Sequence, residues 1–209
     1  MKLIAAGRAS EVFDLGDGRV LRRFRAGGDS KREALVMRHA RREGYPVPGV
    51  VDAVPDAIVM ERIDGNTMLG ELRQRPWTVP RHAALLARLH ARLHEIAAPP
   101  DLPAVGAGDR LLHLDLHPEN VIMSPNGPVV IDWTNARRGD PALDVALTWV
   151  IVATQGGLLA HAFEHEFVRQ FERGDLLAAL PAAAERRVAD PNLTDRERRA
   201  VRRFVERAY

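Results

Sequence analysis

Three oxygen-bearing side chains, Asp115, Asn120 and Asp132, have the types and spacing that best fit a chemical role in this chain. Short apolar runs surround Asn126-Gly127, and Asn-Gly is the strongest two-residue signal for a β-hairpin. With these two residues in the turn, Val121 would face Asp132, so that Asn120 and Asp132 would emerge at the same end of the hairpin. One carboxylate and one amide oxygen held together in this way suit Mg²⁺. The sequence therefore predicts that Asn120 and Asp132 bind magnesium.

Asp115 precedes Asn120 by five residues and can point into the same space without binding the metal. It would then be free to accept a proton as a general base. Each residue also has a plainer interpretation: Asp115 as a turn residue, Asn120 as a cap at the hairpin entry, and Asp132 as a solvated acid. The spacing of the first two and the hairpin relation to the third favour the catalytic interpretation.

This arrangement resembles the catalytic loop and metal-binding aspartate of kinase-like phosphotransferases. The match is closest to the aminoglycoside phosphotransferase family, which also includes choline-kinase-like and other small-molecule kinases. The residues that carry the resemblance are His113, Asp115, His117-Pro118, Asn120, Ile131-Asp132-Trp133, Gly139-Asp140-Pro141 and Asp144. Protein kinases usually carry Arg and Phe-Gly where this chain has Leu114 and Trp133-Thr134, which favours the small-molecule branch. The resemblance implies that Asp144 braces the catalytic loop, although it could instead stabilise the positive start of its helix.

For the nucleotide, the resemblance points to the first third of the chain. Gly7-Arg8-Ala9-Ser10 resembles the phosphate-covering loop in position, with Gly7 and Ser10 as contacts and an ordinary hairpin turn as the alternative. Arg22 stands where the family normally carries a lysine for the α- and β-phosphates, and this exchange is not conservative because arginine is larger and planar. Glu33 matches the helix glutamate that pairs with that basic residue. Alternatively, Ser30 and Glu33 form a capping box.

The adenine base is expected at residues 59–63, which resemble the linker whose backbone receives it in the family. Met60 would line the pocket, and Glu61 and Ile63 would lie beside the base. Backbone recognition leaves little trace in side chains, so this assignment follows from position.

The elements that must position these residues fall into two parts. Strands are expected at residues 2–4, 11–14, 19–25 and 57–63, with a helix from Ser30, its expected N-cap, to Glu43. Asp64-Gly65-Asn66 is the candidate hinge. The rest is mostly helical, with an apolar stripe over residues 81–96, an N-cap signal at Asp140 and a capping box beginning at Thr194. The predicted fold is α+β, bilobal and protein-kinase-like, with a β-rich nucleotide-binding lobe over residues 1–63 and a mainly helical catalytic and acceptor-binding lobe over residues 64–209.

The amino-acid composition further limits the classes of protein to which this chain can belong. The chain has 209 residues, 46% of them hydrophobic and 28% charged, and can bury a substantial core. Without cysteine it has no disulfide, thiolate zinc site or thiol nucleophile. With no apolar run long enough for a bilayer and no signal-peptide pattern, we expect a cytoplasmic protein without membrane contact. The formal net charge is only +2, and arginines alternate with acids, so nucleic-acid binding is not expected.

The predicted function is ATP- and magnesium-dependent transfer of the γ-phosphate to a hydroxyl of a small molecule, an aminoglycoside or another metabolite. A polycationic aminoglycoside would require an acidic cleft. The residues that could supply one are Glu164, Glu166, Glu172 and Asp175, but the arginine-rich final segment leaves a neutral or anionic acceptor equally open.

The main alternative is a nucleotide-binding regulator or scaffold with weak or no activity, motivated by Arg22 and by the sparse phosphate loop. A protein serine or threonine kinase is disfavoured because the span between Asp132 and Asp140 is too short for a long activation segment. A metal-dependent hydrolase that uses no nucleotide is the remotest alternative. The acceptor, the choice of ATP over GTP and the oligomeric state stay open.

Overall fold

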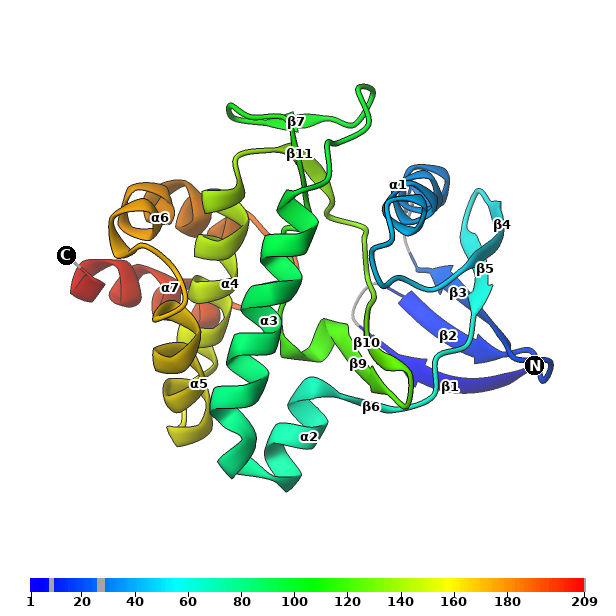
Figure 1. Cartoon of the computed structure of the whole chain (residues 1–209), viewed down its shortest axis with the longest axis horizontal. Helices are drawn as coiled ribbons and strands as arrows, with labels where there is room; N and C mark the ends of the chain where they lie inside the picture. Colours follow the sequence, from blue (N-terminus) through cyan, green and yellow to red (C-terminus); the bar gives the residue numbers. More distant parts are fainter. Residues whose placement is uncertain (8–9, 26–28, 209) are drawn as a thin grey trace.

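A computed structural model of the chain describes residues 1–7, 10–25 and 29–208. Within them a β-sheet occupies the first third of the chain, and the longer helices follow (Figure 1). The strands are β1 Lys2–Ala6, β2 Ser10–Asp14, β3 Arg19–Phe24, β4 Val50–Val54, β5 Ala57–Glu61, β6 Asn66–Thr67, β7 Ala104–Val105, β8 Arg110–Leu112, β9 Val121–Ser124, β10 Gly127–Val130 and β11 Arg137–Gly139. The α-helices are α1 Ser30–Arg42, α2 Met68–Gln74, α3 Val79–His94, α4 Pro141–Gln155, α5 Leu158–Val168, α6 Arg173–Val188 and α7 Asp195–Ala208, and the short 3₁₀ helices are η1 Pro76–Thr78 and η2 Pro118–Asn120. The predicted α+β class is confirmed.

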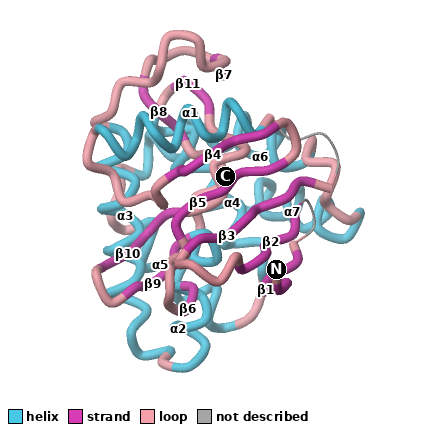
Figure 2. Tube along the Cα trace, turned by 90° about the vertical axis from the view of Figure 1, so that its right-hand side faces the viewer, coloured by secondary structure: helices cyan, strands magenta, loops and turns pink. Residues whose placement is uncertain are grey.

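The N-terminal sheet has five antiparallel strands in the order β1-β2-β3-β5-β4, which cross the view in Figure 2. In β3 the alternation of side chains buries Val20, Arg22 and Phe24 and exposes Arg19 and Arg23. Strand periodicity alone therefore turns one arginine toward the interior, where a charge needs partners.

Helix α1 begins one residue earlier than the sequence predicted. Asp29 is the N-cap, and its carboxylate accepts a hydrogen bond from the Arg32 N–H at 3.0 Å. Ser30 lies inside the helix, and its hydroxyl donates to the carbonyl oxygen of Pro55 at 3.1 Å. The predicted N-cap at Ser30, and the capping box with it, were wrong. The Glu33 carboxylate is consequently not engaged at the helix start.

The β9–β10 hairpin has a different register from the predicted one. Ser124 pairs with Gly127 and Val121 with Val130, so that Pro125 and Asn126 form the turn. With Asn126-Gly127 in the turn, Pro125 and Pro128 would have been the closing pair. Neither proline has an N–H to donate, so that register would lose its first ladder hydrogen bonds. The strand consequently ends at Val130, before Asp132.

The chain leaves the first sheet through Gly65, at the predicted hinge. Its φ is +150°, and a Cβ there would lie 2.3 Å from the carbonyl oxygen of Met123, so only glycine fits. The next residues form β6, which pairs with β9. Whether this segment is a hinge, and whether the lobes divide at residue 63, stay predictions.

The helical part is built around α4, in which residues 143–152 are all buried. Asp140 caps this helix by accepting from the Ala142 N–H at 2.9 Å, and the capping box of Thr194 and Glu197 begins α7. Both capping predictions are confirmed. One continuous hydrophobic cluster runs from Val20 in the sheet to Val201 in α7, so the two parts share a core. Of the helices in the described ranges, none combines the length and hydropathy needed to cross a bilayer.

Candidate active site

The loop after β8 is braced by the carboxylate of Asp144, a fully buried residue in the first turn of α4. Its Oδ2 accepts from the His113 N–H at 3.0 Å, and its Oδ1 accepts from the Leu114 N–H at 2.7 Å. Leu114 has φ +58°, in the left-handed region that is unfavourable for a leucine. The two hydrogen bonds hold this strained backbone in place. The expectation that Asp144 braces this loop is confirmed.

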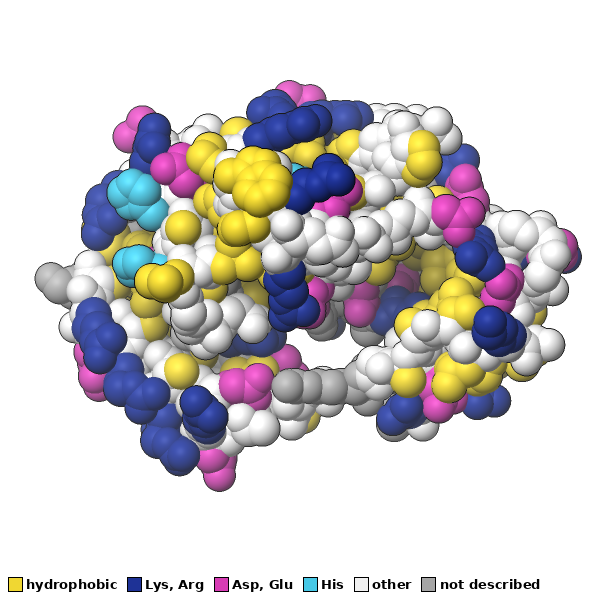
Figure 3. Space-filling model, turned by 90° about the horizontal axis from the view of Figure 1, so that it is seen from below, with side chains coloured by type: hydrophobic (Ala, Val, Ile, Leu, Met, Phe, Trp, Pro, Cys, Tyr) yellow, Lys and Arg dark blue, Asp and Glu magenta, His cyan; other side chains and the backbone are white. Residues whose placement is uncertain are grey.

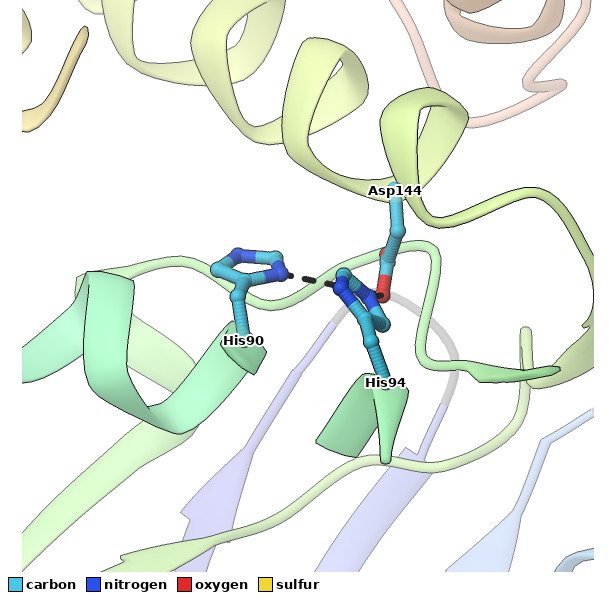
Figure 4. Close-up of side chains that lie close together, drawn as sticks. All are labelled: His90, His94 and Asp144. Carbon is cyan, nitrogen blue, oxygen red and sulfur yellow. Dashed lines mark hydrogen bonds and ion pairs between the residues drawn. The ribbon is translucent and has the colours of Figure 1, made fainter. Parts of the chain in front are cut away.

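Two histidines one turn apart on α3 approach the same carboxylate (Figure 4). His94 Nε2 lies 3.0 Å from Asp144 Oδ2, and His90 Nδ1 lies 3.7 Å from it. Burial alone would raise the pKa of Asp144, but the hydrogen bond from His94 and the nearby histidines hold it well below its usual value. Burial lowers the pKa of His90 to about 3, so this ring is neutral at physiological pH. Because both carboxylate oxygens already bind the loop, we interpret the three side chains as its support.

Replacing Asp144 by asparagine is expected to lower the free energy of unfolding by about 1.5–3 kcal/mol near pH 7, because the charged acceptor of the loop is lost. A depressed carboxyl pKa stabilises the fold above the unfolded pKa of about 3.9, and this contribution disappears as the pH falls toward the folded value. The difference between wild type and variant should therefore shrink below about pH 4. Urea unfolding at pH 7 and in acid measures it.

The control for this variant is Asp140→Asn, the same chemical change in the same helix. Asparagine caps a helix about as well as aspartate, so the unfolding free energy should change little. Equal losses in the two variants would contradict the bracing role of Asp144.

Asp115 and Asn120 lie together at the end of this loop, as predicted. The Asn120 amide nitrogen donates to the Asp115 backbone oxygen at 2.8 Å and to its Oδ2 at 3.2 Å. His117 Nε2 lies 3.5 Å from the other carboxylate oxygen. Burial and the negative charge of Asp132 raise the pKa of Asp115 to about 7, which is in the range suited to a proton acceptor.

Arg22, in the N-terminal sheet, forms ion pairs with two carboxylates, those of Glu33 and Asp132. Its guanidinium forms an ion pair with Glu33 on α1 and another with Asp132 Oδ1, the latter at 2.7 Å. It also donates to the hydroxyls of Ser10 at 3.1 Å and of Thr134 at 3.2 Å. The planar fork thus binds four partners from three separate segments, which a lysine ammonium could not match.

Glu33 and Asp132 respond differently to this shared arginine. Burial raises the pKa of Glu33 although Arg22 opposes the shift. For Asp132, burial would also raise the pKa, but the charge and hydrogen bond of Arg22 bring it below the usual value. Asp132 has φ +66°, so a left-handed turn after the hairpin, and not the strand end itself, aims its side chain. Of the two interpretations of Glu33, the ion pair is confirmed.

The remaining nucleotide-site candidates lie around this cluster or along β5. The Gly7 N–H donates to the Ser10 carbonyl oxygen at 2.8 Å, while Arg8 and Ala9, which the prediction also included, are outside the described residues. Met60 is buried in β5 opposite Val20. The Glu61 carboxylate accepts from the Gly49 N–H and from Arg41. Ile63, just after the strand, is half-buried.

Sequence reasoning missed two contributions to the site. Thr134 bonds Glu33 Oε2 at 2.9 Å and Asp132 Oδ1 at 3.0 Å, and its only sequence signal is its place two residues after a candidate ligand. At the end of α6, Arg187 and Asp190 form a 3.3 Å ion pair, and their charges act in opposite directions on the pKa of Asp115. No local pattern placed the end of α6 near the catalytic loop.

A cavity of about 260 Å³ adjoins the loop that carries Asp115 and Asn120, on its helical side. Its walls come from α2, η2, the end of α4 and the start of α5, and His117 links it to Asp115. Figure 3 looks onto this end of the molecule and shows, separately from this cavity, an opening between the helical side, at left, and the sheet side, at right.

Comparison with known proteins finds similarity to a family of phosphotransferases. The model of the phosphotransferase enzyme family matches residues 1–112 and 107–186. A thiamine kinase of Salmonella paratyphi B is 40% identical over 52 residues, which cover 25% of this chain and 19% of that protein. A probable bifunctional tRNA threonylcarbamoyladenosine biosynthesis protein of Methanoculleus marisnigri is 29% identical over 138 residues, 60% of this chain and 23% of that protein. The chain thus matches less than a quarter of the length of either relative.

Solved structures share the fold over nearly the whole chain. Aminoglycoside phosphotransferase APH(4)-Ia superposes with a TM-score of 0.71 at 16% identity, covering 99% of this chain and 92% of that one. A thermostable mutant of the same enzyme, in a ternary complex with AMP-PNP and hygromycin B, has the same TM-score and coverage at 17% identity. The streptomycin–ATP complex of APH(2'')-IIa gives 0.67 at 17% identity, over 90% of this chain and 82% of that one. The predicted bilobal kinase-like fold is confirmed.

Proposed function

The chain belongs to the phosphotransferase enzyme family, and from this premise we propose that it is a magnesium- and ATP-dependent kinase that phosphorylates a hydroxyl of a small molecule. The observation that carries the proposal is the convergence of Asp115, Asn120 and Asp132. Asn120 donates a hydrogen bond to Asp115, and the negative charge of Asp132 raises the pKa of Asp115. A general base beside two oxygen ligands is the set that phosphoryl transfer requires.

Asn120 and Asp132 fit the demands of a magnesium site. The amide nitrogen of Asn120 faces Asp115, so the amide oxygen of Asn120 points away from Asp115 and toward the proposed cation. Asp132 contacts Arg22 and Thr134 through its Oδ1 atom, so its Oδ2 atom would face the same cation. Magnesium bound there would neutralise charge on the ATP phosphates. Arg22 is expected to exchange its bond with Asp132 for phosphate oxygens, while Glu33 keeps the guanidinium in place.

Asp115 would orient the acceptor hydroxyl and take its proton, and ATP held beside it would supply the γ-phosphoryl group with ADP as the leaving group. The hydrogen bond from Asn120 fixes the carboxylate, so the base is preorganised. For the nucleotide, we propose that Gly7 and Ser10 contact the phosphates and that Met60, Glu61 and Ile63 line the adenine side. The Ser10 hydroxyl is bonded to Arg22 and would act through it.

One alternative keeps specific support. Because Arg22 replaces the usual lysine and is tied to four partners, the protein could bind nucleotide without turnover, as a regulator or scaffold. Incubation with ATP labelled at the γ-phosphate, magnesium and a panel of hydroxylated metabolites and aminoglycosides separates the two functions. We expect label in an organic product, and its loss when EDTA removes magnesium. Nucleotide binding without any labelled product would support the scaffold and contradict the kinase.

A further inference from the structure

The cavity beside the catalytic loop has a direct connection to the proposed base. His117 forms part of its wall, and the Nε2 atom of this residue lies 3.5 Å from Asp115 Oδ1. Pro118 and Glu119, the next residues of the loop, continue the same wall. One end of a molecule bound in the cavity would therefore lie close to the Asp115 carboxylate.

Most of the wall is apolar. The side chains that face the cavity from α2, α4 and α5 include Leu69, Leu72, Ile151, Val152, Leu159 and Phe163. Such a surface releases water and gains free energy when it binds apolar groups.

The charges around the cavity cancel. Its wall carries one basic and one acidic side chain, Arg73 and Glu119. Near Asp115, Arg187 is paired with Asp190 at 3.3 Å. Nothing in this set offers the excess of acids that a polycation requires.

We propose that the acceptor is an alcohol on a compact, predominantly apolar skeleton without net charge, which docks in this cavity and presents its hydroxyl to Asp115. The inference rests on the proposed kinase function. A volume of about 260 Å³ is at the small end of ligand cavities, which excludes large oligosaccharides from full burial there. The site differs in this respect from what hygromycin B or streptomycin, the ligands of the similar structures, would require.

A matched pair of acceptors tests the substrate class with the wild-type protein, ATP and magnesium. The pair is cyclohexylmethanol and its trans-4-aminomethyl derivative, which differ by one aminomethyl group that is positively charged at neutral pH, and gentamicin serves as the polycation. We expect kcat/KM to be at least about tenfold higher for the uncharged alcohol, since an apolar wall leaves the ammonium group unpaired. Preference for the ammonium derivative or for gentamicin would overturn the inference.

A pair of adjacent leucines on α5 tests the location. Leu159 is half-buried and lines the cavity, whereas Leu158 is 92% exposed and does not. Leu159→Glu should raise the KM for the uncharged alcohol about tenfold or more and leave the nucleotide Kd unchanged. Leu158→Glu should match wild type. Both changes place an acid in the first turn of the helix, where it is tolerated.

The two proposals fail in different ways. If Leu159→Glu keeps the wild-type KM, the cavity is not the acceptor site, although the kinase function stands. If no acceptor is phosphorylated, the kinase function fails. Thermal shift then still tests the cavity, because the uncharged alcohol should raise the Tm of wild type and of Leu158→Glu and not of Leu159→Glu. Equal shifts in all three proteins would overturn the cavity assignment.

Discussion

Replacement of Asp115 by asparagine is expected to lower kcat by about 10²–10⁴-fold while nucleotide binding stays nearly unchanged. Asparagine has the same shape but cannot accept the proton of the acceptor hydroxyl. The Asn120 side chain keeps its 2.8 Å bond to the backbone oxygen of residue 115, so the loop and the metal ligand should stay in place. Steady-state turnover together with titration of a non-hydrolysable ATP analogue measures both quantities.

Asp109→Asn is the matched control, since it makes the same change at a side chain that is 76% exposed, just before β8. It should leave kcat and the nucleotide Kd as they are. Undiminished turnover in Asp115→Asn would refute the assignment of the base. A parallel loss of nucleotide affinity would instead indicate that Asp115 organises the nucleotide site.

Replacement of Arg22 by methionine is expected to lower the free energy of unfolding by about 3–5 kcal/mol. The Arg22 side chain is 6% exposed and that of Glu33 only 2%, so the variant leaves a buried carboxylate without its cation. Two hydroxyl groups, those of Ser10 and Thr134, also lose a donor. Urea unfolding followed by circular dichroism gives the free energy.

The control lies next to it in the same strand. Arg23 is 52% exposed and pairs with Glu11 at the surface, so Arg23→Met should cost less than about 1 kcal/mol. If the two methionine variants unfold at the same urea concentration, the buried ion pairs contribute nothing to stability. Arg22→Lys, which restores the lysine usual in the family, should fall between wild type and Arg22→Met because one ammonium cannot satisfy four separate partners.

The sequence predicted the site best where a signal depends on neighbouring residues. The five-residue spacing of Asp115 and Asn120 brought the two side chains together, because a short loop cannot separate them. Alternation along β3 turned Arg22 to the buried face. The ion pair of Glu33 was the preferred one of two interpretations, and the true N-cap at Asp29 explains why the other failed.

Prediction was weaker where two signals competed. Asn126-Gly127 favoured one hairpin register, but the prolines on either side of it cannot close that turn, so the strands shift. The direction of the Asp132 side chain then depends on a left-handed backbone conformation, which aspartate adopts more readily than most residues but which its local sequence does not specify.

The sequence by itself determined the α+β class, the proximity of Asp115 and Asn120 and the caps of α4 and α7, since each depends on patterns of residues close together in the chain. Only the tertiary structure decided that Thr134 joins the ion-pair cluster, that Arg187 lies near Asp115, and that an apolar cavity adjoins the loop. These contacts join segments up to about a hundred residues apart, such as Arg22 and Asp132. Their energy depends on how whole helices pack, which local patterns do not specify.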